Sequence, residues 1–134
     1  MAMTKKEHIK YWVGAAEMDW NRAERCFKDK DYVFCLFCLH LSLEKIIKAT
    51  WVEYNEKNIP PKIHNLVALI KMTPLEIQEK DMFFLGYMNK FQLEGRYPDY
   101  AGKIYKECTR EYTKGMMRKA KQLKVWFLKD LQKI

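Results

Sequence analysis

The chain has 134 residues, of which 49% are hydrophobic and 31% are charged, with only 5 Gly and 4 Pro. This length predicts one domain that buries roughly two-thirds of its unfolded surface, and the composition argues against a disordered chain and a strand-rich sandwich. The net charge of +8 favours an anionic partner, such as nucleic acid, a nucleotide or an acidic protein.

The first helix is predicted from Thr4 to Lys30, because apolar side chains recur there every three or four residues. Thr4 and Glu7 have the spacing of a capping box at its start. The polar residues 28–31 form a break short enough to force an antiparallel return of the chain. We therefore expect the first two helices to pack side by side as a hairpin.

The second helix, predicted over residues 31–51 (DYVFCLFCLHLSLEKIIKATW), is expected to form the centre of the fold. This stretch lacks Gly and Pro and is too long for an ordinary strand, and Asp31 can cap its start. Its first half is apolar on all sides, so other parts of the protein must surround it. In its second half, His40, Glu44 and Lys48 follow one another at four-residue spacing and form one polar stripe.

Two further helices are predicted after a loop at residues 56–62, where consecutive prolines stop the second helix. A short helix is expected over residues 63–72. A longer one is expected from Pro74 to Leu93, with Thr73 as its N-cap and Glu76 completing a capping box. Its predicted apolar stripe contains Leu75, Ile77, Met82, Phe83, Leu85, Tyr87, Met88 and Phe91.

The last helix is predicted over residues 109–134, with apolar side chains turned inward and many Lys and Arg side chains turned outward. The expected fold is therefore all-α: an up-and-down antiparallel bundle of four main helices plus one short helix. The whole chain is expected to be one domain.

The four cysteines, at positions 26, 35, 38 and 108, are predicted to be free thiols in the core. The Cys35 and Cys38 pair lies inside the apolar second helix, and no second pair or nearby His completes a metal site. No secretory segment or membrane span is evident, so we expect a cytoplasmic protein without membrane association. No cofactor-binding motif is found, and no cofactor or metal is expected.

Three polar clusters are candidates for ligand binding, and the predicted bundle can bring them together at one end or side of the second helix. They are His40, Glu44, Lys45 and Lys48 in that helix, His64 with Asn65 before the third, and Arg96, Tyr97 and Asp99 after the fourth. Arg96 follows a glycine and precedes Tyr-Pro-Asp, a rigid arrangement that can direct a guanidinium at phosphate.

Each cluster also has a purely structural interpretation. A histidine among leucines, such as His40, is usually a hydrogen-bonded core residue. Glu44 and Lys48 have the spacing of an ordinary helical ion pair, and His64 and Asn65 are placed to cap the third helix. Arg96 and Asp99 can form an ion pair that holds their loop. The Lys and Arg side chains of the last helix are either a solvated face or a source of nonspecific attraction to RNA.

Three segments resemble the HEPN family (higher eukaryotes and prokaryotes nucleotide-binding). HLSLEKIIKA at 40–49 is similar to the family's H-x-A-x-E-K-x-x-K-A signature, IHNLVALI at 63–70 to its H-D/N-L-x-x-L element, and EGRYPD at 94–99 to its A-R-Y-P-D segment. The order and spacing also agree, from about residue 8 to 132. The resemblance implies an antiparallel helical bundle, a homodimer, and a minimal nucleotidyltransferase partner in a toxin-antitoxin-like module.

The resemblance also brings in metal-independent ribonucleases, in which an Arg and a His four to six residues apart, R-x(4-6)-H, form a composite site across a dimer. Arg96 matches the arginine of that motif, but positions 101–103 are Ala, Gly and Lys, so the histidine is missing. Without it, the usual carrier of general acid-base chemistry is absent from the motif. This departure favours a noncatalytic nucleotide- or protein-binding domain.

Two other functions remain open. The first is a divergent endoribonuclease that combines Arg96 with His64 or His40 from another helix. The second is an antitoxin-like scaffold that has no ligand of its own. A homodimer is expected under each, because so small a core cannot easily enclose all of the large side chains, namely Trp12, Trp20, Trp51 and Trp126.

Overall fold

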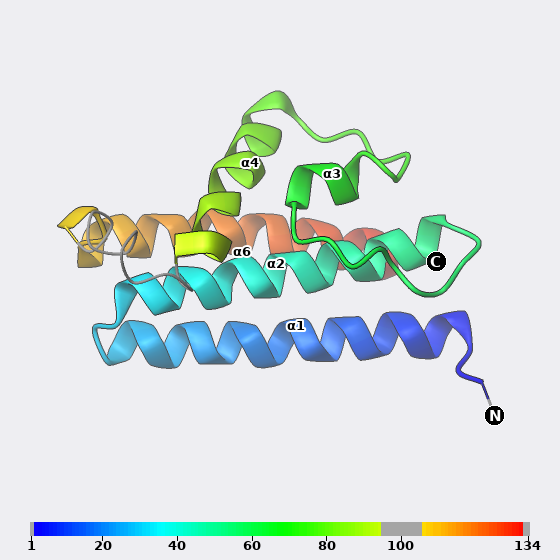
Figure 1. Cartoon of the computed structure of the whole chain (residues 1–134), viewed down its shortest axis with the longest axis horizontal. Helices are drawn as coiled ribbons and strands as arrows, with labels where there is room; N and C mark the ends of the chain where they lie inside the picture. Colours follow the sequence, from blue (N-terminus) through cyan, green and yellow to red (C-terminus); the bar gives the residue numbers. More distant parts are fainter. Residues whose placement is uncertain (1, 95–105, 133–134) are drawn as a thin grey trace.

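A computed structural model describes residues 2–94 and 106–132, and these form five helices. They are α1 (Lys5–Lys28), α2 (Tyr32–Tyr54), α3 (Leu66–Ile70), α4 (Glu79–Glu94) and α6 (Arg110–Gln132). No strand is present among these residues. Figure 1 shows α1, α2 and α6 as three long helices along one axis, while α3 and the inclined α4 cover the other side of α2. The predicted all-α bundle is confirmed.

Helix α2 is the centre of this bundle, because it packs against α1, α3, α4 and α6. Its side chains at Leu36, Leu39, Leu43 and Ile47 are completely buried. Each buried aliphatic side chain of this kind stabilises the fold by about 1.5–3 kcal/mol. Protein therefore encloses most of the apolar half of this helix, but the prediction that it is surrounded on all sides is confirmed only in part, because Phe34 is 43% exposed.

The α1–α2 hairpin depends on a tight turn at residues 28–31. The amide of Asp31 donates to the Cys26 carbonyl at 2.9 Å, and the amide of Lys30 donates to the Phe27 carbonyl at 3.1 Å. These two bonds form a Schellman motif, which needs a left-handed residue after the helix. Lys30 fills that position with a φ of 62°. The Asp31 carboxylate then caps α2 by accepting from the Phe34 amide.

The direction of the remaining helices follows from long-range contacts. The Cys35 sulfur lies 3.8 Å from that of Met117, and the Tyr54 hydroxyl donates to Asp130 at 2.7 Å. The two helices α2 and α6 therefore run in the same direction. Helix α4 runs opposite to α6, since Asp81 pairs with Lys119 and, one and a half turns later, Tyr87 contacts Tyr112. This is the alternating order of an up-and-down bundle.

The predicted start of the fourth helix is wrong. The Thr73 hydroxyl donates to the Ile70 carbonyl at 2.7 Å and accepts from the Leu75 amide, so it closes the turn after α3 and caps no new helix. Residues 75–78 lie outside any helix, and α4 begins at Glu79 with acidic side chains in its first turn. Those charges suit the positive end of the helix dipole.

Two other details differ from the sequence prediction. Helix α3 is shorter than expected, because Asn65 caps it by accepting from the Ala68 amide at 3.0 Å. Phe83, placed in the inward stripe of the fourth helix, is 76% exposed, whereas Leu85, Met88 and Phe91 are buried. With the helix starting at Glu79, the inward face is set by these three side chains.

The cysteines behave largely as predicted. All four are free, and Cys35, Cys38 and Cys108 are buried, while Cys26 is partly exposed. Burial raises the pKa of the Cys35 and Cys38 thiols to about 12, so both remain protonated at neutral pH. No helix among the described residues is both long enough and apolar enough to cross a membrane.

Candidate functional site

The candidate site centres on the carboxylate of Glu44, which lies almost completely buried on α2. Lys48, one turn later, donates to it at 2.9 Å. His64, from the segment before α3, places its Nδ1 atom 3.0 and 3.1 Å from the two carboxylate oxygens. Two of the three predicted clusters therefore meet at one buried acid.

The contact between His64 and Glu44 fixes the state of the imidazole. An ionised carboxylate only accepts hydrogen bonds, so the Nδ1 atom of His64 must carry the proton. The other ring nitrogen, Nε2, has no hydrogen-bond partner in the described part of the chain. Because the His64 side chain is 44% exposed, an incoming ligand can reach it. A carboxylate that orients a solvent-accessible imidazole is an arrangement suited to proton transfer.

Lys48 has a different position in the cluster. Its Nζ atom is also 5.5 Å from the centre of the Trp12 ring on α1, which adds a cation-π contact to the ion pair. The side chain is only 7% exposed. Lys48 therefore neutralises Glu44 inside the protein and is poorly placed to contact a ligand.

His40 lies completely inside the protein, with its Nδ1 atom 3.9 Å from Glu44. Asn89 and the His64 backbone lie close to the His40 ring, but neither ring nitrogen makes a hydrogen bond of ordinary geometry within residues 2–94 and 106–132. Burial lowers its pKa, and the nearby Glu44 carboxylate opposes that shift only in part. His40 is therefore a core residue with no route to a substrate, as the structural interpretation of the sequence predicted, but the hydrogen bond that this interpretation expected is not formed.

The lowered pKa of His40 makes stability depend on pH. Unfolding restores the ordinary pKa of 6.5, so below that pH the unfolded chain binds a proton that the folded chain rejects. The resulting stability is complete above pH 6.5 and is lost as pH falls toward the lower folded value. We expect the free energy of unfolding, measured with urea between pH 7.5 and 5.5, to depend less on pH in His40→Leu than in the wild type. The slope should fall by up to about 1.4 kcal/mol per pH unit.

Every other ionisable side chain remains in the His40→Leu variant, so the difference between the two profiles isolates His40. Leucine suits a completely buried position and introduces no polar atom that needs a partner. Parallel profiles for the variant and the wild type would show that His40 does not carry the pH dependence.

Asn89 connects α4 to this site and was not singled out from the sequence. Its side-chain oxygen accepts from the Leu66 amide at 2.9 Å, and its amide donates to Asn65 at 3.1 Å. The first amide of α3 is thereby satisfied from α4. Asn89 precedes Glu94, where α4 ends, by little more than one turn. Arg96, Tyr97 and Asp99, the third predicted cluster, lie outside the described residues.

Asp19 is a second buried acid that the sequence prediction missed. It accepts from Arg22 at 2.7 Å and from Lys45 at 2.5 Å, so it links α1 to α2. One signal was present in the sequence, since Asp19 falls between Ala16 and Ala23 on the inward face of an amphipathic helix. Its partners neutralise its charge, and its role is to join the hairpin.

A hydroxyl pair between α4 and α6 was also missed. The Tyr87 and Tyr112 oxygens lie 2.7 Å apart, and Lys90 donates to Tyr87 at 2.7 Å. Burial and the bond to Tyr87 raise the pKa of Tyr112, so this phenol stays protonated.

No cluster of His, Cys, Asp and Glu that could hold a metal occurs in the described ranges.

Comparison with known proteins gives one match. A family model described as HEPN domain matches residues 9–131, a range that includes nearly all of α1 and α6 and everything between them. No curated protein matches the chain, and no solved structure does. The matched range contains Glu44, its partners and Arg96.

Proposed function

The chain belongs to the HEPN domain family, and from this premise we propose that it binds the phosphate of a nucleotide or RNA through Arg96. The observation that carries the proposal is the EGRYPD segment, in which Arg96 stands where the family's arginine is expected, while positions 101–103 lack the histidine of the ribonuclease motif. A guanidinium binds phosphate through two parallel hydrogen bonds and remains charged at any physiological pH.

Two features of the described residues support binding without cleavage. His40 is enclosed and neutral, and Lys48 is already engaged with Glu44, so neither can contact a substrate. The net charge of +8 attracts polyanions at long range. The protein therefore has the charge needed to bind RNA but few accessible acid-base groups.

The proposal extends to assembly. We propose a homodimer that works beside a nucleotidyltransferase partner in a toxin-antitoxin-like module, as the family resemblance implies. Large apolar side chains on the surface support an interface: Tyr11, Met18, Ile59, Phe83 and Trp126 are all exposed. Trp20 and Trp51 are buried in the core of one chain. Support for a dimer therefore comes from the exposed apolar side chains named above.

The test of the proposed function is the affinity of the purified protein for a labelled RNA oligonucleotide. Arg96→Ala is expected to weaken binding about tenfold or more, because a hydrogen bond to a charged group contributes about 1.5–3 kcal/mol and about 1.4 kcal/mol corresponds to a factor of ten. Lys62→Ala removes an equal charge from an exposed loop position and serves as the control. If both variants lost the same affinity for RNA, the effect of Arg96 would come only from the net charge of the protein, and the proposed contact would be contradicted.

A divergent metal-independent endoribonuclease is the second candidate, and one observation favours it. Glu44 orients the accessible His64 as a carboxylate orients a catalytic imidazole, so His64 can replace the histidine missing from the motif. His40 is excluded from this role by its burial. RNA incubated with the protein and a metal chelator separates the two functions: cleavage abolished by both Arg96→Ala and His64→Gln establishes the nuclease, and intact RNA excludes it.

A further inference from the structure

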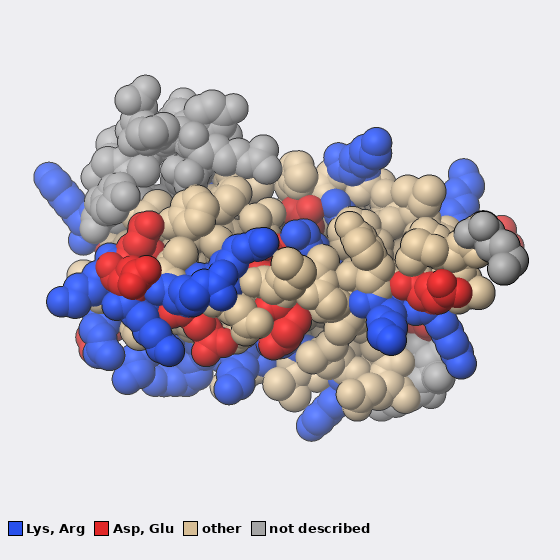
Figure 2. Space-filling model, turned by 90° about the horizontal axis from the view of Figure 1, so that it is seen from below, with Lys and Arg blue, Asp and Glu red and all other residues tan. Residues whose placement is uncertain are grey.

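A groove of about 370 Å³ separates α1 from α6, on the opposite side of the bundle from α3. Its lining combines apolar and basic side chains: Trp20, Glu24, Phe27, Lys114, Met117, Arg118 and Lys121. Figure 2 shows the α1 side of the molecule, where Lys and Arg side chains gather toward the end that holds the α1–α2 turn. This groove is separate from Glu44 and its partners.

The cations along this groove follow one face of α6. Arg110, Lys114, Arg118, Lys121 and Lys124 are spaced by three or four residues, which places them on a single stripe. At 1.5 Å per residue the stripe is about 21 Å long, with the Cβ atoms of successive positions about 5–6 Å apart. Within the described ranges, Lys114, Arg118 and Lys121 have no ion-pair partner, whereas other lysines do, namely Lys45, Lys48 and Lys119.

The two ends of the stripe are held over aromatic rings of α1. The Arg110 guanidinium lies 5.3 Å from the centre of the Phe27 ring, and Lys124 lies 4.5 Å from that of Trp20 while pairing with Glu17. These contacts fix the groove walls at both ends. Between them, the three unpaired cations stand over a floor that includes the half-buried side chains of Phe27 and Met117.

From this arrangement we propose that the groove between α1 and α6 is a second binding surface, which holds the backbone of single-stranded RNA. The row of cations along α6 attracts the negative charge of a phosphate backbone, and the half-buried apolar side chains beside it offer contact to bases. The inference rests on the proposed function and assigns it an RNA strand instead of a lone nucleotide.

An acidic polypeptide is the other anionic polymer to consider, and the groove is less suited to it. Its carboxylates would gain the same charge attraction, but they make no use of the apolar floor, which bases can contact. The α1 wall of the groove carries the acidic side chains Glu24 and Glu17, so the cations lie on the α6 wall. One strand of phosphates along α6, with bases turned toward α1, fits this asymmetry.

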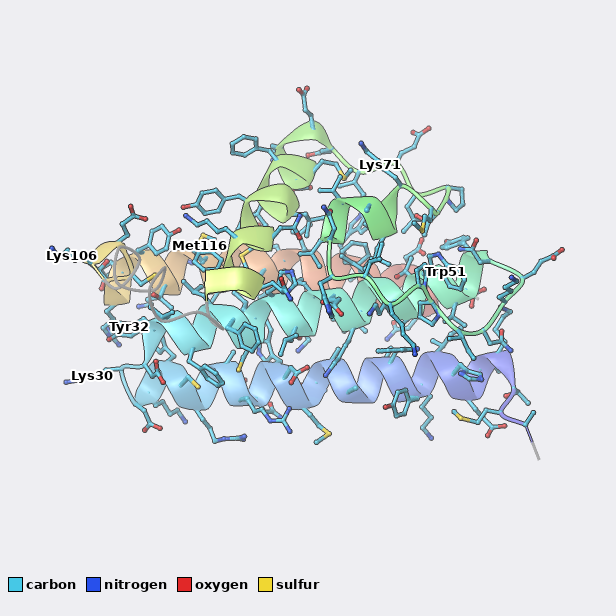
Figure 3. All side chains as sticks on the ribbon, viewed as in Figure 1. Lys30, Tyr32, Trp51, Lys71, Lys106 and Met116 are labelled. Carbon is cyan, nitrogen blue, oxygen red and sulfur yellow. The ribbon has the colours of Figure 1, made fainter. Side chains whose placement is uncertain are left out.

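The test compares two variants of equal charge change in the full chain. K114Q/R118Q/K121Q removes the three unpaired cations, and K57Q/K62Q/K71Q removes three exposed lysines elsewhere; Lys71 lies beside α3, away from α1 (Figure 3). The probes are a fluorescein-labelled 12-residue oligouridylate and uridine monophosphate. The groove variant is expected to bind the oligomer about tenfold more weakly, and its salt slope should fall by about 2, at about 0.7 per lost contact. In the control variant, both the affinity for the oligomer and the salt slope should change less.

The groove proposal and the proposed function fail in different ways. If the groove variant binds the oligomer like the control variant while Arg96→Ala weakens it, the groove is overturned and the Arg96 function stands. If the wild type binds neither probe, both are overturned. If polyglutamate displaces the oligomer as effectively as unlabelled oligouridylate, the surface belongs to an acidic protein and the RNA assignment is wrong. Unchanged binding of the monophosphate in the groove variant confirms that its fold is intact.

Discussion

Replacing Glu44 with alanine is expected to lower the free energy of unfolding by about 3–5 kcal/mol, because it leaves the Lys48 ammonium buried without a counter-ion. The wild-type pair is 2.9 Å apart, with both side chains nearly inaccessible to water. The change also frees His64, which holds the segment before α3 against α2. Urea unfolding at pH 7.5 measures the loss.

The matched control is Glu53→Ala on the same helix. Glu53 is partly exposed and has no ion pair among the described residues, so its replacement is expected to change stability by no more than about 0.5 kcal/mol. A Glu44→Ala variant as stable as this control would mean that water reaches Lys48 and that the cluster is not buried as described. Glu44→Ala/Lys48→Met should recover much of the lost stability, since it removes the unpaired charge.

Truncating Phe91 to alanine is the second large effect, with an expected loss of about 3–5 kcal/mol from burial and cavity formation. Phe91 is almost completely buried on α4 and meets the Tyr87 ring edge-on, at 6.1 Å between ring centres. It is the last side chain of α4 that the structure shows buried. Thermal or urea unfolding measures the change.

Phe83 on the same helix provides the comparison. It is the same residue type but is largely exposed, so Phe83→Ala is expected to be nearly neutral. This pair tests the corrected inward face of α4 directly. Equal destabilisation of both variants would contradict the helix register described here, and greater destabilisation by Phe83→Ala would restore the stripe predicted from the sequence.

The long helices could be predicted because their signals are local. Thr4 and Glu7 form the expected capping box, and Asp31 caps α2 as expected. The apolar run of α2 required surrounding protein, and the structure packs other helices around most of it, although Phe34 stays exposed. Each of these inferences depends on neighbouring residues, which a single sequence displays.

The boundaries of α3 and α4 could not be predicted in the same way. Thr73 and Glu76 have the spacing of a capping box, but the Thr73 hydroxyl is used by the turn after α3. Asn65 is held by Asn89, a residue 24 positions later. Competition for a hydrogen bond between distant segments leaves no periodic pattern in the sequence.

The candidate site was predictable in part. Glu44 and Lys48 were expected to pair from their helical spacing, and they do. The approach of His64 to Glu44 depends on the path of the chain between α2 and α3, so it was a hypothesis until the structure placed both residues. The partial exposure of His64 and the complete burial of His40 separate two histidines that the sequence left equivalent.

The central claim is that this HEPN domain binds RNA phosphate through Arg96 without cleaving it. The most direct measurement is an equilibrium titration of labelled oligouridylate with the wild type and Arg96→Ala in the presence of a metal chelator, followed by sizing of the recovered RNA. We predict salt-dependent binding by the wild type, a loss of about tenfold or more in the variant, and full-length RNA at the end. Equal affinity of the two proteins, or RNA shortened by the wild type alone, would contradict the claim.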